Sequence, residues 1–475
     1  MKSKICLSVL CCSFITSCTF YPKYQRENTP KESSWVVQLP NSEINQLGGN
    51  FWEEFQDPVL NLLVQKALVN NQEIQIAIEN VKIFLAKYGV VRSKSFPQVQ
   101  ANIDGMRQKS SIATDSSLSA NNLISNNFDT IFNASYLLDF WGEVRSANEA
   151  AYRQYTSSIQ ARKQVVLTIA ASTMTSYFLL RQYDMQLNIS KKTIYDRKKS
   201  YDLAKIRYEL GLTSKLQVEQ ALAELEFTIL EKERLDILVG QTEDLISVLI
   251  GEPSTEIKRG KSVDEIKLPK TIFLAAPSSI LDMRPDIKQA EQSLMAANAQ
   301  IGVAKAKFFP QMNLFGSLGI DSSQLNSLFQ YNSGIWSYGI NIIQEIFTGG
   351  KLTGNLQLTE AEKRKLVHQY SSTILNAFKE VNDALIQYKY QLEIVDTQQK
   401  RVDALSKYLN ISLLQYNEGQ IDYLTYLDAE RSLFDAQLQQ VESIAKSLQS
   451  IVQIYQSIGG NWVESADKIA VLEKK

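Results

Sequence analysis

The sequence predicts a mainly α-helical chain that carries two β-hairpins and consists of two similar halves in tandem. Three observations predict this fold class: two matching glycine turns, two very long helical patterns without proline, and two regions in which apolar and polar residues alternate. Tyr208 lies three residues before Gly211, as Tyr416 lies three residues before Gly419, and similar residues surround both turns. Self-similarity of this kind is the signature of a duplicated supersecondary unit.

We therefore expect five segments along the chain of 475 residues. They are a signal peptide (1–17), a lipid-anchored N-terminal tether (18–50), the first structural repeat (51–260), the second structural repeat (261–462) and a C-terminal tail (463–475). Each repeat is expected to hold a helix, a hairpin, a long helix, a glycine turn and a return helix. The 50 basic and 51 acidic residues nearly balance, so the composition gives no indication of a nucleic-acid surface.

The first segment has the layout of a bacterial secretory signal. Two lysines precede an apolar run, residues 5–15, that is too short to span a bilayer. The Ile-Thr-Ser-Cys motif that ends at Cys18 resembles a lipobox, in which the cysteine is acylated and becomes the first mature residue. Thr19 favours sorting to the outer membrane, because an Asp at this position would suggest retention in the inner membrane. A simple signal with an incidental cysteine is the alternative.

Alternating residues predict the hairpins, at 99–103 with 130–140 and at 312–320 with 336–342. Strands of about ten residues, one apolar face, aromatic ends and long polar loops suit a membrane β-barrel. Soluble hairpins packed on helices are the alternative. Four strands cannot close a barrel, and unpaired edges in hydrocarbon are costly, so a spanning sheet requires oligomerisation.

Helical patterns flank each hairpin. A first helix is expected to begin after Asp57 and to end near Pro97. The long helices are expected at 143–209 and 352–417, each roughly 95 Å in length. The last return helix carries a row with steps of three and four, which predicts a coiled coil: Leu424, Leu427, Arg431, Phe434, Leu438, Val441, Ala445, Leu448, Val452 and Tyr455.

The sequence contains no recognisable motif for catalysis, for metal binding or for phosphate binding. His368, the single histidine, lies on a polar helical stretch without a second histidine or a cysteine nearby, so an exposed helix residue is favoured over a metal ligand. Gly349-Gly350-Lys351 lacks the spacing of a phosphate-binding loop. We expect no enzyme activity, no metal and no cofactor.

Taken together, several motifs resemble the TolC-like outer-membrane efflux proteins, and within them the OprM-type (NodT-type) lipoproteins of resistance-nodulation-division systems. The motifs are WEEFQDPVLNLLVQKALVNN from Trp52, RSKSFP from Arg92, LDFWGEVR from Leu138, ILDMRPDIKQAEQSLMAANAQIGVAKAKFFP from Ile280, IFTGGKL from Ile346, the second turn YNEGQIDYLTYLDAERSLF and the closing SIGGNW. Two positions depart from the family pattern. Gln217 stands where the family often has Asp, and Asn461 replaces a Gly.

The resemblance implies an outer-membrane exit duct for small amphipathic compounds that extends into the periplasm. It implies a homotrimer with a twelve-stranded β-barrel and a long antiparallel coiled-coil α-barrel. The implied partners are a periplasmic adaptor (membrane fusion) protein, an inner-membrane resistance-nodulation-division pump and outer-membrane lipid. The adaptor is expected to dock on the two turns, which comprise Gly211, Leu212, Thr213, Ser214, Gly419 and Gln420.

The resemblance also places Tyr416, Leu424 and Asp428 at a constricted aperture near the periplasmic end. Asp428 lies one residue beyond Leu427 of the predicted packing row, which puts it off the core. Three symmetry-related carboxylates near one axis would repel each other and attract cations. Tyr416 hydroxyls, Lys389 or Arg431 could offset the repulsion. Alternatively, Asp428 is a solvated residue on the outer surface.

Two other functions stay open at this stage. The same architecture serves type I protein secretion, although the lipobox and the motif from Ile280 favour efflux. A lipid-anchored coiled-coil spacer or adhesin without a pore is the structural alternative, and the amphipathic hairpins argue against it.

Overall fold

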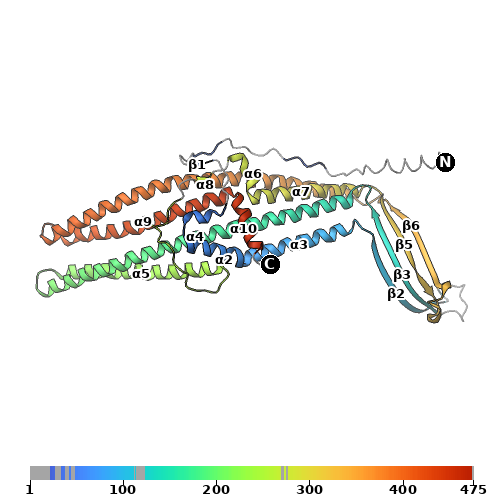
Figure 1. The fold of residues 1–475 in the computed structure, drawn as a ribbon, viewed down its shortest axis with the longest axis horizontal. Helices are drawn as coiled ribbons and strands as arrows, with labels where there is room; N and C mark the ends of the chain where they lie inside the picture. The colour runs from blue at the N-terminus through green and yellow to red at the C-terminus, as the bar shows by residue number, and fades with distance from the viewer. Residues whose placement is uncertain are drawn as a thin grey trace. The chain divides into compact units, whose positions relative to one another are not determined.

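The structure is a computed structural model, shown in Figure 1, that describes most of the chain. The described residues are 22–26, 34–37, 42–43, 49–111, 113, 124–268, 272–273 and 276–472. The expected signal peptide and Cys18 lie outside them. No helix of this described part is both long enough and apolar enough to span a membrane.

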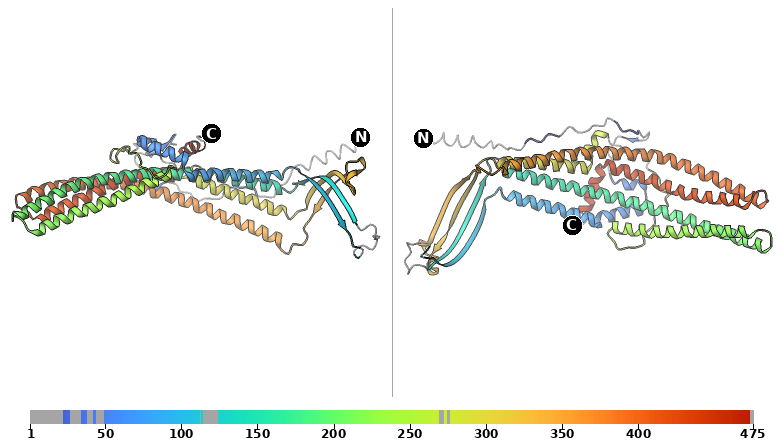
Figure 2. Two further views of the ribbon diagram at one scale, coloured as in Figure 1. Left: turned by 90° about the horizontal axis from the view of Figure 1, so that it is seen from below. Right: turned by 180° about the vertical axis from the view of Figure 1, so that it is seen from behind.

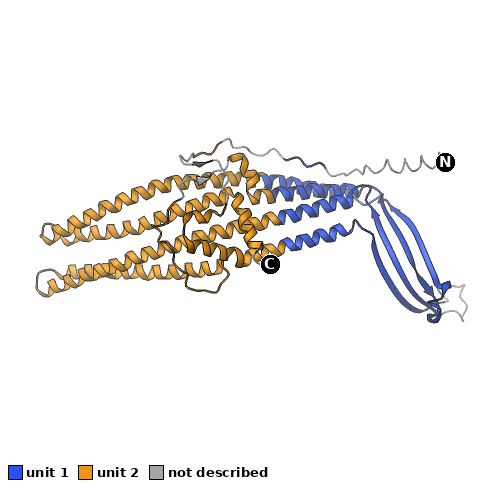
Figure 3. Cartoon of the chain, in the orientation of Figure 1, with its two compact units in different colours: residues 1–28, 81–158, 290–370 blue, residues 29–80, 159–289, 371–475 orange. Residues whose placement is uncertain are grey.

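The chain divides into two compact units, which are coloured separately in Figure 3 and described in turn. Unit 1 comprises residues 1–28, 81–158 and 290–370, and unit 2 comprises residues 29–80, 159–289 and 371–475. Each unit draws on both expected repeats, because the long helices pass from one unit into the other.

Unit 1 contains one four-stranded antiparallel sheet with the strand order β2-β3-β5-β6 (Figure 1). The strands are β2 (Gln98–Lys109), β3 (Ile124–Leu138), β5 (Gln311–Ser322) and β6 (Gly334–Ile343), and the short 3₁₀ helices η4 (Leu325–Ser327) and η5 (Tyr331–Ser333) lie between the last two. Both expected hairpins are present. The structure adds a pairing that the sequence did not indicate, since β3 and β5 join the two hairpins along residues 128–138.

The two longest helices are α4 (Glu143–Glu209) and α8 (Lys351–Asn417), each of 67 residues, as the proline-free stretches predict. Each turns back within unit 2 into a shorter helix, α5 (Lys215–Leu249) after α4 and α9 (Tyr423–Ile458) after α8. The three views in Figures 1 and 2 show both pairs as antiparallel neighbours whose turns lie at the same end of the unit.

The expected single helix from Asp57 to Pro97 is wrong, because the structure divides it into α2 (Pro58–Asn70) and α3 (Gln72–Ser93). The break is at Asn71, whose backbone is extended. Its Oδ1 accepts hydrogen bonds from the N–H groups of Glu73 (2.9 Å) and Ile74 (3.3 Å), and its Nδ2 donates to the carbonyl of Leu249 (2.9 Å). A side chain that caps a new helix competes with continuation of the old one.

The core of unit 2 begins with the 3₁₀ helix η1 (Phe51–Phe55), whose rings pack on the C-terminal helix α10 (Asn461–Leu472). The ring centroids of Phe51 and Trp462 lie 4.7 Å apart, and both side chains are fully or almost fully buried. Most of the segment expected as a C-terminal tail is therefore helical. The remaining short elements of the unit are β1 (Ser42–Glu43) paired with β4 (Ile272–Phe273), then η3 (Pro277–Ser279) and α6 (Ile280–Met283); α7 (Pro285–Ala306) follows and continues into unit 1.

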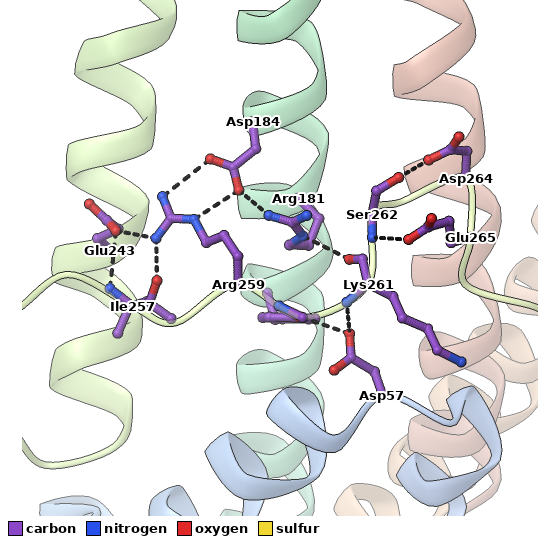
Figure 4. Close-up of polar contacts among 12 residues, drawn as sticks. Asp57, Arg181, Asp184, Glu243, Ile257, Arg259, Lys261, Ser262, Asp264 and Glu265 are labelled. Carbon is purple, nitrogen blue, oxygen red and sulfur yellow. Dashed lines mark hydrogen bonds and ion pairs between the residues drawn. The ribbon is translucent and has the colours of Figure 1, made fainter.

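A network of polar contacts holds the loop after α5 against α4 (Figure 4). Arg259 of the loop forms ion pairs with Asp184 of α4 (Nε to Oδ2, 3.0 Å) and with Glu243 of α5. Arg181 donates to the carbonyl oxygen of Lys261 (2.9 Å) and pairs with the same Asp184 (2.5 Å). Charge-assisted hydrogen bonds thus hold the loop on α4.

Asp57 anchors the far end of this network and is fully buried. Its Oδ1 accepts from the N–H groups of Val59 (2.8 Å) and Leu60 (3.3 Å), which caps α2. Its Oδ2 accepts from the hydroxyl of Tyr177 (2.7 Å) and from the N–H of Lys261 (3.0 Å). One carboxylate therefore connects α2, α4 and the loop.

Candidate functional site

The sheet of unit 1 has one apolar face and one polar face. Residues paired across neighbouring strands share a face, and the register gives two apolar rows: Ala101, Phe132, Leu318 and Trp336; and Val99, Ala134, Gly316 and Tyr338. Trp336 and Tyr338 are 71% and 80% exposed. The opposite face carries the polar row Gln100, Asn133, Ser317 and Ser337. Such alternation suits strands that separate lipid from an aqueous lumen.

The two turns of unit 2 have the same backbone geometry. Gly211 and Gly419 have φ values of 72° and 73°, as the sequence predicts for residues that end helices in the left-handed region. The N–H groups of Leu212 and Gln420 donate to carbonyls five residues back, at 2.8 Å in both cases. A Cβ at either glycine would meet nothing within 4 Å, so only the backbone conformation requires glycine there.

The residues expected to receive the adaptor lie at these turns. Gly211, Leu212, Ser214, Gly419 and Gln420 are exposed, whereas Thr213 is half-buried. The hydroxyl of Thr213 donates to the side chain of Gln217, the position at which the family often has Asp. In this protein the hydrogen bond across the first turn therefore joins two uncharged side chains.

Tyr416 belongs to a cluster of tyrosines beside the second turn. Its ring stacks on that of Tyr426 (5.7 Å between centroids, 14° between planes) and lies 5.6 Å from that of Tyr423. Arg207 of α4 lies over the ring of Tyr416 at 5.7 Å, and its Nη1 donates to the Tyr416 hydroxyl at 3.4 Å. This cation–π contact connects the ends of the two long helices.

Leu424 and Asp428, one turn apart on α9, are both exposed. Asp428 thus lies off the packing core, as expected. Leu424 is 54% exposed and does not start the packing row, so this part of the heptad prediction is wrong. The buried row runs instead through Tyr423 and Leu427. The ring of Tyr423 packs within the tyrosine cluster, so the face of α9 that carries these two residues points to the core.

Farther along α9, the predicted row is buried at most positions up to Tyr455, but not at Arg431, whose side chain is 49% exposed. Arg431 donates to Glu224 of α5 from Nε at 2.6 Å. On its other side, Glu224 pairs with Arg197 of α4 at 3.1 Å, and the Arg197 side chain is only 1% exposed. Arg197 also donates to the carbonyl oxygen of Glu224 (2.9 Å) and to Thr228 (2.5 Å).

A further carboxylate, Glu430, is buried beside this group. Burial raises its pKa, an effect that Arg197 partly offsets and Glu224 reinforces. Burial likewise lowers the pKa of Arg197. The sequence analysis missed Arg197 and Glu224. The signal was present for Glu224, which lies on the same face of α5 as the apolar residues Ala221 and Leu225.

His368 is an exposed residue of α8, as the sequence favours. Within the described residues, no group of three or more histidine, cysteine, aspartate or glutamate side chains could hold a metal ion. The candidate functional features are therefore the exposed face of the sheet, the two glycine turns and the clusters of charged residues.

Comparison with known proteins assigns the family. The sequence model of the outer membrane efflux protein family matches residues 63–238 and 276–460. The probable efflux pump outer membrane protein TtgC of Pseudomonas putida is 31% identical over 470 residues, which cover 97% of this chain and 96% of TtgC. The cation efflux system protein CusC of Escherichia coli is 30% identical over 455 residues, covering 94% and 96%.

Among solved structures, the open state of the Neisseria gonorrhoeae MtrE outer membrane channel superposes with a TM-score of 0.83 at 27% identity, and covers 93% of this chain and 98% of that one. Family and fold agree over nearly the whole length. This protein is a member of the outer membrane efflux protein family, whose members are channels of the outer membrane.

Proposed function

We propose that this protein is the outer-membrane exit duct of a tripartite efflux system for small toxic compounds. The observation that carries the proposal is the sheet of unit 1, which exposes a continuous apolar face with aromatic residues and a polar face behind it. Relatives are named as outer membrane proteins of antibiotic and toluene efflux pumps and as a protein of a cation efflux system. The duct itself is passive, and the inner-membrane pump supplies the energy.

Assembly of three copies follows from the same sheet. β2 and β6 form its edges, and neither edge has a further strand partner among the described residues. An open edge in hydrocarbon is too costly to persist. Three copies supply twelve strands, enough for a closed barrel. Conductance of the purified protein in planar bilayers, combined with its mass in detergent, tests the proposal, and a non-conducting or monomeric protein would contradict it.

The division into two repeats is part of this proposal. It is supported by the two separate matches to one family model and by the similar turns at Gly211 and Gly419. Each repeat supplies one hairpin and one antiparallel helix pair, so six pairs from three copies would surround a common axis as an α-barrel.

Lipidation of Cys18 is expected to give a mature chain that begins at this residue and carries acyl groups. Because several strands bury far more apolar surface than acyl chains do, the anchor should aid targeting while the barrel holds the protein in the membrane. Mass spectrometry of the mature N-terminus checks this prediction. An unmodified terminus elsewhere would exclude it.

Replacement of Gly419 by valine is expected to impair drug export while the trimer stays in the outer membrane. A β-branched residue at φ 73° is strained, so the turn should rearrange and its exposed surface should fit the adaptor less well. Crosslinking to the adaptor measures the effect. Gly419→Asn is the matched control, since asparagine tolerates this region. Wild-type crosslinking of the valine variant would show a purely local effect.

Asp428→Ala is expected to lower cation selectivity and to weaken block by multivalent cations applied from the periplasmic side. Three exposed carboxylates close to one axis attract cations into the constriction, and alanine removes all three. Single-channel recordings provide the measurement. Glu226→Ala, which removes an exposed carboxylate of α5, is the control. Unchanged selectivity and block would place Asp428 away from the aperture.

A further inference from the structure

Unit 1 contains a pocket of about 420 Å³ between α7 and α8. Pro22, Ile301, Lys305, Glu360, Lys363, Arg364, Val367 and His368 line it. On α8, the four-residue spacing of Glu360, Arg364 and His368 puts these side chains on one face, and Lys305 faces them from α7.

The pocket is strongly basic. Lys305, Lys363 and Arg364 contribute three positive charges and Glu360 one negative charge, so the lining has a net charge of about +2 with His368 neutral. None of the four basic side chains forms an ion pair or a hydrogen bond with another residue of the described part of the chain. By contrast, Arg26 of the nearby N-terminal segment is paired with Glu291.

The chain leading from the expected lipid anchor passes this pocket. Pro22 forms part of the wall, and its carbonyl accepts a hydrogen bond from Nδ2 of Asn298 at 2.6 Å. Two residues on, the Tyr24 hydroxyl donates to Glu291 at 3.2 Å, and Arg26 pairs with the same carboxylate at 2.8 Å. These bonds fix the segment to α7.

In sequence, both walls of the pocket lie near segments expected to contact the membrane. Pro22 is the fourth residue after Cys18, a reach of roughly 14 Å in a fully extended chain. Lys305 lies six residues before Gln311, the first residue of β5. The residues that line the pocket are therefore close in sequence both to the expected anchor at Cys18 and to strand β5.

We propose that this pocket binds the phosphate group of an anionic phospholipid of the periplasmic leaflet. Arginine and lysine together bind phosphate oxygens through charge-assisted hydrogen bonds, and basic pockets beside membrane segments bind lipid head groups in this way. A head-group contact a few residues after Cys18 would add to the attachment that the acyl groups and the barrel provide, and would fix the start of the tether at the membrane surface. The inference rests on the proposed outer-membrane function.

The test compares two double variants of the full-length protein, each of which removes two positive charges. Lys305→Gln/Arg364→Gln removes one cation from each wall of the pocket. Lys307→Gln/Lys365→Gln, at neighbouring exposed positions outside the lining, removes the same charge and is the control. Native mass spectrometry measures the binding of phosphatidylglycerol, with phosphatidylcholine as the neutral lipid. Because all four side chains are exposed or half-buried and none forms a hydrogen bond or a close ion pair with the described residues, both pairs should fold.

We expect the pocket pair to bind phosphatidylglycerol about tenfold more weakly than wild type, and the control pair to bind it as wild type does. Glu360→Gln should act in the opposite direction and tighten binding about threefold, because it removes the one opposing charge. Phosphatidylcholine should bind no better to wild type than to the pocket pair.

Inorganic phosphate distinguishes the two sources of the anion. If an excess of it leaves phosphatidylglycerol bound, the ligand is the lipid; if it displaces the lipid fully, the pocket is a site for free phosphate. Equal binding of phosphatidylglycerol by the pocket and control pairs would overturn the inference. Conductance of each variant in planar bilayers is recorded separately, so a failure of the channel function is distinguishable from a failure of the lipid site.

Discussion

Glu224→Leu is expected to destabilise the helical end of unit 2 by about 3 kcal/mol or more, the range for loss of one partner of a buried ion pair. Without the Glu224 carboxylate, the guanidinium of Arg197 stays 1% exposed and loses its ion pair; its remaining hydrogen-bond acceptors, the main-chain carbonyl of residue 224 and Thr228, are neutral, and Glu430 is the carboxylate left nearby. Hydrogen–deuterium exchange in α4, α5 and α9 measures the effect, because local opening there reports the free energy of this region.

Two further variants separate the charge from the packing. Arg197→Met/Glu224→Leu replaces the buried pair by apolar groups of similar size and should recover part of the loss, since such replacements are often neutral, while Glu430 loses the cation that offsets its burial. Arg431→Met removes the other, half-exposed partner of Glu224 and should cost less than about 1 kcal/mol. A double variant as unstable as Glu224→Leu alone would contradict the electrostatic explanation.

Asp57→Ala is expected to be the second large effect, with a loss of about 3 kcal/mol or more in the free energy of unfolding of unit 2. The substitution removes the cap of α2 and leaves four donors at a fully buried position without their acceptor, namely the N–H groups of Val59, Leu60 and Lys261 and the hydroxyl of Tyr177. Loss of a cap costs about 1 kcal/mol. Each buried donor that water cannot reach adds about 1–3 kcal/mol.

The control for Asp57→Ala is Asp422→Ala. Asp422 caps α9 through the N–H of Thr425 at 2.9 Å, but it is exposed, so water can replace the lost acceptor. Its removal should cost about 1 kcal/mol. Thermal unfolding of the two variants under identical conditions checks the difference. Equal shifts of the midpoint would mean that burial of Asp57 contributes nothing beyond the cap.

The elements that depend on local periodicity could be predicted from the order of the residues alone. Helices α4 and α8 extend along the proline-free stretches, the alternating residues form β2, β3, β5 and β6, and both turns have glycine at positive φ. These features could be predicted because a repeat of 3.6 or of 2 residues, or a glycine at a helix end, acts within a few residues of itself. The family motifs, spread over both halves, likewise needed no coordinates.

Contacts between residues that are distant in sequence became visible only in the folded chain. Leu424 is exposed because Tyr423 packs within the tyrosine cluster. The β3–β5 pairing, the Arg197–Glu224 pair and the pocket between α7 and α8 join residues far apart in sequence. Periodicity shows which face of an element is apolar, but not which partner covers it or at what register. The role of a charged residue on an apolar face therefore becomes clear only when the opposite charge that it contacts on another helix is known.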